Sequence, residues 1–379
     1  MLFWQMLLGV RLIIKNITGD YSSTVKIHKL LGKYGTIFVL IHPFLESYSY
    51  AQNLVFTLPD FTTEFGRQIT VGRAAFFMAA TIWLTSAIIR KSMKYRPWIY
   101  LHYLSYPIMF FVFLHARELG TFLNTIPFIK LYFYLLMAGY LVVMAVKAYA
   151  VLNFDKKTFK LSKVVKSDGN IFAYTLQPIN KRILFLPGQF AYIKTHFFGE
   201  SHPFSVTEYN EKTGELVFGI KATGKFTNKI TSLKRGHVFY LDGPHGKFTL
   251  EGQNNEPKIL IAGGIGITPF IELVKRFGDK NTYLFYSNPF LKNAIYRSEV
   301  KKILKNNYFD VITKENIKDE KVINGRLTYK AIEMAVGKNL LNKSRIFICG
   351  SPSFNEGIKK MLLDSGVNKN KIFIEDFGF

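Results

Sequence analysis

Two apolar stretches of this sequence each carry a histidine at either end: HKLLGKYGTIFVLIH at residues 28–42 and HYLSYPIMFFVFLH at residues 102–115. The histidines are 14 residues apart in the first stretch and 13 in the second. On a helix that rises about 1.5 Å per residue, these separations are about 21 Å and about 20 Å. Because an ionisable side chain in hydrocarbon is costly unless it is paired, such histidines indicate a functional site.

Two parallel helices with matched histidine pairs suit two stacked metal groups, one near each face of a membrane. We therefore predict that two haems are held here, each iron bound from both sides. The four predicted ligands are His28, His42, His102 and His115.

The helical phase fits the first stretch better than the second. At 100° per residue, His42 returns to within about 40° of the face that carries His28, whereas His115 ends about 140° away from His102. Pro107 lies between His102 and His115. Because proline removes a helix hydrogen bond, a local kink there is expected to change the phase.

Composition divides the chain of 379 residues, which is long enough for two or three domains. Long apolar runs dominate residues 1–151, whereas residues 155–379 have the pattern of a soluble α/β protein. The formal net charge is +24, but the basic residues gather beside apolar segments, which favours membrane lipid over nucleic acid. The single cysteine, Cys349, excludes an internal disulfide framework and fits a reducing compartment.

Four apolar spans are long enough to cross a bilayer. They cover residues 28–56, 71–90, 98–116 and 128–151, approximately.

Basic residues mark one end of these spans, at Lys26–Lys33, Arg90–Arg96 and Lys147–Lys160. The positive-inside rule places all three ends in the cytoplasm. We therefore predict a multi-pass protein of the plasma membrane whose soluble half is cytoplasmic. Residues 1–14 are too short to span, and we expect them to be the latter part of a helix that begins before this sequence.

The soluble half changes character at Pro257. Short alternating segments separated by Gly and Pro precede it, which predicts an antiparallel β-barrel. Strands, glycine turns and helices alternate after it, which predicts a parallel sheet covered by helices. The predicted domains are a transmembrane helical bundle at 1–153, a flavin-binding β-barrel at 154–255 and an α/β nucleotide-binding domain at 256–379.

A glycine-rich turn follows the buried strand Lys258–Ala262 and opens a helix. Glycines allow backbone to approach a pyrophosphate, and a helix N-terminus favours its charge. A second strand, Arg345–Ile348, ends in Cys349-Gly350 at the carboxyl edge, where nucleotides bind in open sheets. The predicted nucleotide-binding residues are Gly263, Gly264, Gly266, Thr268, Pro269 and Gly350.

Two short motifs in the barrel suit a ligand with a flat, polar-edged ring and a phosphate, which the family resemblance given below implies to be a flavin. The stretch His202–Ser205 offers an aromatic ring and polar groups for a flat ring system, and Gly224–Thr227 precedes a helix that can seat a phosphate. The terminal Phe379 is free to stack and to swing away. The predicted flavin-binding residues are His202, Pro203, Phe204, Ser205, Gly224 and Thr227.

In the order of these motifs the chain resembles the NADPH oxidase and ferric reductase superfamily in its prokaryotic form, from about Lys26 to Phe379. The resemblance implies FAD, two b-type haems held by the histidine pairs, and NADPH, with NADH as the other candidate nucleotide. It also implies that Phe379 covers the flavin and that Cys349 lies at the site of hydride transfer.

The chain departs from this family in three places. The family usually has six membrane helices, and the first is absent here together with part of the second. Glu46 stands where eukaryotic oxidases carry a further histidine, and Gly350-Ser351 replaces the more usual Gly-Pro. These departures leave the terminal acceptor open.

The predicted function is electron transfer from cytoplasmic NADPH through FAD and two haems to an acceptor outside. We favour O2, giving superoxide, over a ferric chelate. Two alternatives are a membrane-anchored flavin reductase without transmembrane electron flow and a haem-binding module without enzymatic activity. A haem spectrum and haem reduction by nucleotide distinguish them. The sequence does not indicate an oligomeric state.

The expected nucleotide is NADPH rather than NADH. After the second strand of the nucleotide domain comes Tyr286–Pro289, without the acidic residue that holds a free ribose 2′-hydroxyl in NAD sites. Lys292, Arg297 and Arg326 are the nearby cations that can bind a 2′-phosphate, and Arg326 is the predicted ligand.

Overall fold

The computed structural model describes residues 1–10, 13–14, 21–50, 59–167, 170–246, 248 and 256–375. The chain forms two compact units, Met1–Phe154 and Asp155–Phe379, which are treated separately below.

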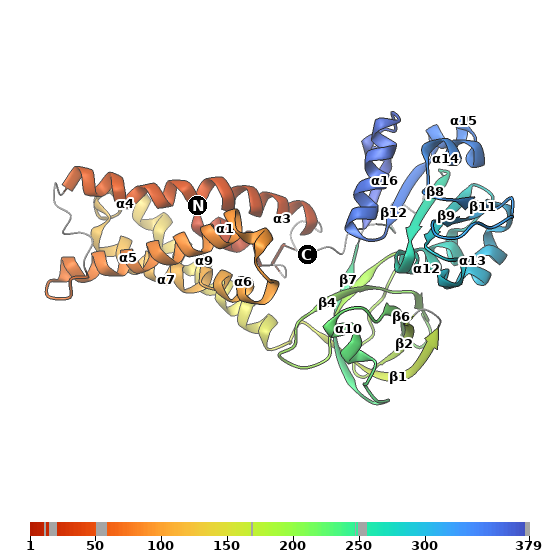
Figure 1. Ribbon diagram of the computed structural model, residues 1–379. Coiled ribbons are helices and arrows are strands. Elements are labelled where there is room, and N and C mark those ends of the chain that lie inside the picture. The colour runs from red at the N-terminus through yellow and green to blue at the C-terminus, as the bar shows by residue number, and fades with distance from the viewer. Residues whose placement is uncertain are drawn as a thin grey trace. The chain divides into compact units, whose positions relative to one another are not determined.

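The first unit is entirely helical over its described residues (Figure 1). Its α-helices are α1 (Leu2–Leu8), α3 (Tyr21–Leu30), α4 (Thr36–Tyr50), α5 (Glu64–Trp83), α6 (Tyr95–His102), α7 (Ser105–Leu119), α8 (Thr121–Thr125) and α9 (Pro127–Val151). A π-helical turn, η1 (Leu31–Gly35), joins α3 to α4, and another, η3 (Leu84–Ile88), extends α5. The short 3-10 helix η4 (Arg90–Ser92) follows.

Three of the described helical segments are long and apolar enough to cross a membrane: Glu64–Ile88, Tyr95–Leu119 and Pro127–Val151. They match three of the four predicted spans. The fourth prediction, residues 28–56, falls on the helix that runs from Tyr21 through η1 to Tyr50, and residues 51–58 lie outside the described part of the chain. This helix does not meet the same criterion, because histidines, Glu46 and a run of Ser and Tyr lower the hydropathy of its described portion.

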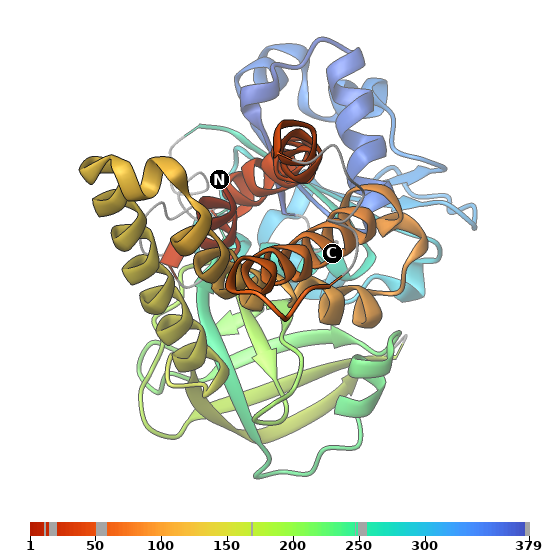
Figure 2. The same cartoon turned by 90° about the vertical axis from the view of Figure 1, so that its left-hand side faces the viewer.

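A small apolar core joins these helices. Phe3 and Met6 of α1 are buried against α5, α7 and α9 together with Ala75, Met109 and Val143. Most remaining side chains of the spans are exposed in the isolated chain, as expected of surfaces that face lipid. Figure 2 views several of these helices nearly end on.

The second unit contains two sheets. The first is antiparallel, with the strand order β4-β3-β7-β1-β2-β6-β5, and β4 also contacts β6. Its strands are β1 (Lys157–Ser167), β2 (Ile171–Pro178), β3 (Phe190–Lys194), β4 (His202–Ser205), β5 (Glu208–Tyr209), β6 (Leu216–Lys221) and β7 (Val238–His245), with the short helix α10 (Lys225–Ile230). Side chains that alternate along the strands fill its interior, including Phe159, Phe218 and Phe239.

The second sheet is parallel, with the order β11-β10-β9-β8-β12-β13. Its strands are β8 (Lys258–Gly263), β9 (Thr282–Asn288), β10 (Tyr308–Ile312), β11 (Val322–Asn324), β12 (Arg345–Cys349) and β13 (Ile372–Glu375). The helices are α12 (Thr268–Phe277), α13 (Arg297–Leu304), α14 (Tyr329–Val336), α15 (Lys338–Lys343) and α16 (Pro352–Asp364).

Both faces of the parallel sheet are buried, which explains the continuous apolar runs in its strands. Leu260 and Ala262 of β8 face α12 and α13, whereas Ile259 and Ile261 face the helices α14 to α16. The predicted fold class, a helical transmembrane bundle followed by an antiparallel flavin domain and a parallel-sheet nucleotide domain, is confirmed.

Candidate functional site

The four predicted ligand histidines form two pairs in the helical unit. The ring centroids of His28 (α3) and His102 (α6) lie 6.1 Å apart, with the ring planes at 75°. The centroids of His42 (α4) and His115 (α7) lie 6.5 Å apart, at 79°. We call these the inner pair and the outer pair. Each pair brings together one histidine from residues 28–42 and one from residues 102–115.

Both distances fit two imidazoles that bind one metal ion from opposite sides. A metal–imidazole nitrogen bond is about 2 Å long. Since the ring centre lies about 1 Å beyond the nitrogen, two such ligands place their centroids about 6 Å apart. The two observed distances lie close to this value, and in each pair the ring planes are steeply inclined to each other.

The second ring nitrogen of each histidine faces an oxygen of the protein. A histidine that ligates a metal usually donates its other N–H to such a group, which fixes its tautomer and orientation. Here the Nδ1 partners are the Gln5 carbonyl for His28 at 2.9 Å, the Ser86 hydroxyl for His102 at 3.2 Å, the Gln68 carbonyl for His115 at 3.0 Å and the Glu46 carboxylate for His42 at 3.7 Å. For His28, His102 and His115, whose Nδ1 atoms lie within hydrogen-bond distance of their partners, Nε2 is left as the nitrogen suited to iron. The distance from His42 to Glu46 is that of an ion pair rather than a hydrogen bond.

The helix break between α6 and α7 accounts for the misfit in phase. Tyr103 and Leu104 lie between the two helices, and Leu104 and Tyr106 donate to carbonyls three residues earlier rather than four. Pro107 has no N–H to offer the carbonyl of Tyr103, four residues before it. The predicted kink is therefore present, and His115 is turned toward the side of His42.

A glycine allows the outer pair to form. A Cβ atom built on Gly72 of α5 would lie 2.4 Å from Nδ1 of His115. Any larger residue at position 72 must displace the imidazole. Gly72 was not among the predicted site residues, since only the packing of α5 on α7 identifies it.

The donor set suits haem rather than a metal held by protein alone. Within the described ranges, no group of three or more His, Cys, Asp or Glu side chains is arranged to hold a metal ion. A haem iron takes four nitrogens from its own macrocycle, so two axial histidines complete its coordination. The residues at both pairs therefore fit the predicted group.

In the flavin domain, the predicted motif forms the edge strand β4. The His202 ring stacks on the Phe226 ring with centroids 3.8 Å apart. The Phe204 ring also faces Phe226, with centroids 6.0 Å apart and ring planes at 18°. Ser205 is buried. Phe226 lies inside the predicted Gly224–Thr227 turn, but the sequence did not identify it as a ring that packs on the other motif.

The Gly224–Thr227 turn is held by its own threonine. The Thr227 hydroxyl accepts hydrogen bonds from the backbone N–H groups of Thr223 and Gly224, at 3.0 and 2.8 Å. The threonine thus fixes the backbone that the sequence analysis assigned to a phosphate. Whether Gly224 and Thr227 contact a phosphate stays a prediction.

The two nucleotide motifs meet at one edge of the parallel sheet. Strands β8 and β12 are neighbours, with Ala262 in register with Cys349, and the chain order reverses between them. This is the topological switch point at which open α/β sheets bind nucleotides. A Cβ atom on Gly266 would lie 2.1 Å from the Cys349 carbonyl oxygen, so only glycine permits this approach.

Phe354, in the first turn of α16, packs against the same edge. Cβ atoms on Gly263 and Gly350 would each come within 3.0 Å of its ring, at 2.9 and 2.5 Å. Neither glycine can therefore be enlarged without moving Phe354. The sequence analysis missed this residue, although an aromatic side chain just after the Cys349–Pro352 turn was visible in it.

The remaining predicted nucleotide residues have local roles as well. Gly264 has a positive φ of 55°, which favours glycine. The Thr268 hydroxyl donates to the Ile265 carbonyl at 3.1 Å, and Pro269 occupies the first turn of α12, where it needs no N–H partner.

The two predicted catalytic residues differ in what the structure describes. Cys349 is only 1% exposed and lies in the core cluster between β12 and α12. Its proposed role at the site of hydride transfer stays a prediction. Phe379 lies outside the described residues.

One of the three candidate cations for a 2′-phosphate is already engaged. Arg297 donates from Nε to Asp310 at 2.8 Å, and Asp310 also accepts from the Tyr308 hydroxyl at 2.7 Å. Burial and the Asp310 carboxylate raise the pKa of the Tyr308 phenol. Arg326, by contrast, is exposed just after β11.

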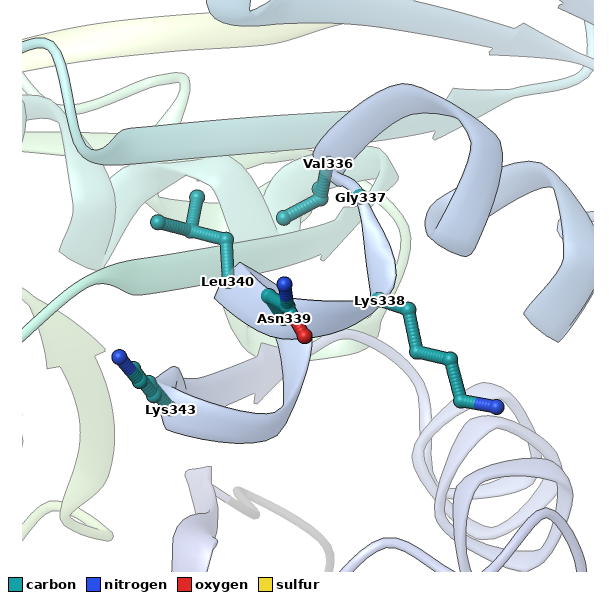
Figure 3. A pocket seen from close by; sticks show the side chains of 6 residues that line it. All are labelled: Val336, Gly337, Lys338, Asn339, Leu340 and Lys343. Carbon is teal, nitrogen blue, oxygen red and sulfur yellow. The ribbon is translucent and has the colours of Figure 1, made fainter.

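A surface hollow lies away from these residues. It is lined by Val336, Gly337, Lys338, Asn339, Leu340 and Lys343, where α14 meets α15 (Figure 3). None of the predicted site residues lines it, and we assign it no role.

Comparison with known proteins identifies three domains. Residues 1–113 match the family described as "Ferric reductase like transmembrane component", residues 156–268 match "FAD-binding domain" and residues 260–360 match "Oxidoreductase NAD-binding domain". The predicted resemblance is confirmed by this combination. FAD and nicotinamide nucleotide binding are therefore established at the level of the domains.

Similar curated proteins match part of the chain. Flavohemoprotein A of Dictyostelium discoideum is 23% identical over 246 residues, which cover 59% of this chain and 61% of that protein. The reductase component of propane 2-monooxygenase from Mycolicibacterium smegmatis is 24% identical over 223 residues, 55% of this chain and 64% of that protein. The chain thus spans about three fifths of the length of these relatives.

Solved structures share the fold. The flavohemoglobin of Malassezia yamatoensis, with bound FAD and haem, has a TM-score of 0.53 at 20% identity and covers 94% of this chain and 97% of its own. The FAD/NAD-binding domain of a nitric oxide dioxygenase from Vibrio cholerae has a TM-score of 0.51 at 19% identity and covers 59% and 99%. At these identities the likeness establishes the fold alone.

Proposed function

We propose that this chain, whose domains have the architecture of the NADPH oxidase and ferric reductase superfamily, carries electrons across the plasma membrane. NADPH in the cytoplasm reduces FAD, two b-type haems carry the electrons outward, and O2 outside accepts them to give superoxide. The observation that carries this proposal is the presence of two histidine pairs, each with metal-like separation and an oxygen partner on Nδ1.

The spacing of the two pairs is what a transmembrane path requires. Within each stretch the two ligands are about 20 Å apart along the helix, so one pair lies nearer each end of the helical unit. Haem bound by two histidines supplies one-electron transfer and keeps no open coordination position for a substrate. An acceptor therefore receives its electron at the edge of the macrocycle, without binding the iron.

The chain's own residues do three things in this scheme. The histidines and their oxygen partners hold two groups at fixed positions. The turn at Gly263 and Gly264, beside Gly350, offers partly exposed backbone for a dinucleotide pyrophosphate. The flavin-domain motif at His202–Ser205 presents an aromatic and a hydroxyl group for the isoalloxazine ring, whose redox chemistry converts hydride into single electrons.

A ferric-chelate reductase is the second candidate, favoured by the description of the family that matches residues 1–113. The two activities share every component except the acceptor. Comparison of the acceptors on one preparation therefore distinguishes them.

The test uses the full chain in detergent or liposomes, loaded with FAD and haem. We expect NADPH to reduce the haems under nitrogen, with superoxide forming when air is admitted. Two results together identify the ferric reductase. Without oxygen, an external ferric chelate is reduced to ferrous iron, and with oxygen present no superoxide forms. A preparation that binds haem but is not reduced by NADPH contradicts both.

A further inference from the structure

The inner ligand His102 has an aromatic neighbour that the other three ligands lack among the described residues. The indole of Trp98, one helical turn earlier in α6, stacks on the His102 ring with centroids 5.1 Å apart and planes at 29°. Residues four apart lie on the same helix face, so the helix itself presents the two rings to each other. The contact restricts rotation of the His102 side chain and therefore the orientation of its imidazole plane.

The hydroxyl of Ser86 joins the same two rings. Trp98 donates from Nε1 to the Ser86 oxygen at 3.1 Å, and Nδ1 of His102 lies 3.2 Å from that oxygen. An indole N–H can only donate, so the serine oxygen must accept from it. The oxygen has a second lone pair, with which it can accept from His102 when Nδ1 of that ring carries the proton.

This arrangement suits the tautomer that a haem ligand requires. If Ser86 accepts from Nδ1–H, the proton of the neutral imidazole is on Nδ1 and the lone pair is on Nε2. Ser86 lies in the π-helical turn η3, and π-turns widen the helix and redirect side chains at functional sites. The turn brings Ser86 into contact with α6, where both of its partners lie.

Arg90 fixes the indole in turn. Its guanidinium carbon lies 4.2 Å from the centroid of the Trp98 ring, and Nη1 donates to the Met93 carbonyl at 3.3 Å. Tryptophan is the aromatic residue that binds cations best through its ring face. The basic segment at Arg90–Arg96, which sets membrane orientation, therefore also supports a ligand.

We propose that Ser86, Trp98 and Arg90 form a ligand clamp that fixes the tautomer and ring plane of His102, and that this clamp sets the electronic properties of the inner haem. The three residues act through His102, so they are positioning residues. The opposite ligand, His28, has a single backbone carbonyl in the same role. The inference rests on the proposed function only in requiring haem at the inner pair.

The clamp should influence the haem in a definite direction. A hydrogen bond accepted from Nδ1–H makes the imidazole a stronger electron donor, which favours ferric over ferrous iron. Removal of the acceptor should therefore raise the midpoint potential of the inner haem. Loss of such a partner commonly weakens metal binding by about 10- to 100-fold.

The experiment compares full-length Ser86→Ala, Trp98→Phe and Trp98→Leu in a His115→Ala background, which leaves only the inner pair intact. Trp83→Phe is the matched control, because Trp83 donates to the Lys33 carbonyl at 2.8 Å and has no ring contact with a ligand histidine among the described residues. Haem content, the low-temperature EPR g values of the ferric haem and its midpoint potential are measured.

We expect Ser86→Ala to raise the potential and weaken haem retention. Trp98→Leu should change the g values, which depend on the ligand planes, and Trp98→Phe should do so less because a ring remains. The Trp83→Phe control should match its parent. Unchanged g values and potential in both Ser86→Ala and Trp98→Leu, with haem bound, overturn the clamp.

Two further outcomes are informative. If Trp98→Leu loses the inner haem but retains the outer one in an otherwise unaltered chain, the clamp is supported. If the unaltered chain binds no haem, the proposed function fails, and that failure is distinct from a failure of the clamp.

Discussion

The inner and outer histidine pairs have the same ligands at nearly the same separation, but different surroundings. The inner pair is held by a carbonyl, a serine hydroxyl and a stacked indole. The outer pair has a carbonyl on one side and the Glu46 carboxylate on the other. His42 and Glu46 are also more than half exposed in the isolated chain, at 57% and 53%. The two sites thus share a pair of histidines but differ in their polar environment.

The difference suggests distinct tasks. In the proposed function an inner haem would receive electrons from FAD, and neutral hydrogen-bond partners with an aromatic contact would hold its ligand in a fixed orientation. An outer haem would deliver electrons to a molecule from outside. The carboxylate beside His42 also adds negative charge at the outer site. The predictions below test this contrast.

Removal of a ligand should give the largest effect. We expect His102→Ala to lose the inner haem and His115→Ala to lose the outer one, each leaving about half of the haem, because each iron depends on two protein ligands. Electron transfer to the acceptor should be abolished in both. The haem-to-protein ratio and NADPH-driven superoxide formation measure these effects.

His196→Ala is the matched control for this experiment. His196 lies in the flavin domain, where its Nε2 atom is 3.0 Å from Nζ of Lys229. It should retain both haems. Full haem content in His115→Ala would show that the outer pair is not a haem site.

A single added methyl group should weaken haem binding at the outer pair and leave the inner pair unaffected. In Gly72→Ala the new Cβ would lie 2.4 Å from Nδ1 of His115, so the imidazole must move from its hydrogen bond to Gln68. We expect the outer haem to bind about 10- to 100-fold more weakly. Gly9→Ala is the control, since its Cβ would meet the His28 ring at 3.4 Å, an ordinary contact, and the Met6 carbonyl oxygen at 3.3 Å, which requires only a small shift.

Spectra that resolve the two haems, recorded during dialysis or competition with apomyoglobin, measure this loss. Equal retention of both haems in Gly72→Ala would mean that α5 yields easily at this position. Loss of the inner haem in Gly9→Ala would mean that the inner pair is the more tightly packed one, which reverses the comparison.

Local patterns in the sequence predicted much of this architecture. The four histidines, three of the spans and the glycine turn after β8 are all visible as spacing or periodicity, because a helix or a strand–turn–helix unit imposes its own repeat. The kink at Pro107 was also predictable in kind. Its size was not, since the break at Tyr103 and Leu104 depends on how α6 and α7 pack.

What the sequence did not predict are contacts between distant segments. Gln68 is 47 residues from His115, and Ser86 is 16 from His102, so no periodicity links them. The same is true of Gly72 and of Phe354, whose roles appear only once neighbouring elements are in place. Arg297 was one of three candidate cations, and only the register of β10 shows that Asp310 engages it.

Replacement of the outer carboxylate should have a moderate effect. Glu46→Gln keeps the shape of the side chain and removes its negative charge, 3.7 Å from Nδ1 of His42. We expect the midpoint potential of the outer haem to rise while the inner potential stays constant. Because the pair is largely exposed, the change in haem affinity should be less than tenfold. A redox titration that resolves both haems is the measurement, and an equal shift of both would show that Glu46 does not act locally.

The smallest effect should come from a change in the nucleotide domain, which in the proposed function supplies electrons to the haems at both histidine pairs. Arg326 follows Gly325 in an exposed turn after β11, and the turn needs glycine because its φ is 95°. An exposed ion pair with a 2′-phosphate contributes about 1 kcal/mol, so Arg326→Ala should raise the KM for NADPH about fivefold. The KM for NADH should not change, because NADH lacks that phosphate. Lys338→Ala, at the hollow between α14 and α15, is the control.

This last variant also tests whether the pairs act in series. At limiting NADPH, a weaker nucleotide site should slow reduction of the inner and outer haems by the same factor, since both depend on one source of electrons. Stopped-flow spectra of the two haems measure this. If Arg326→Ala slows only one haem, the other has a different electron donor. If the KM values for NADPH and NADH are equal in the unaltered chain and unchanged in Arg326→Ala, Arg326 does not bind the 2′-phosphate, and the preference for NADPH is wrong.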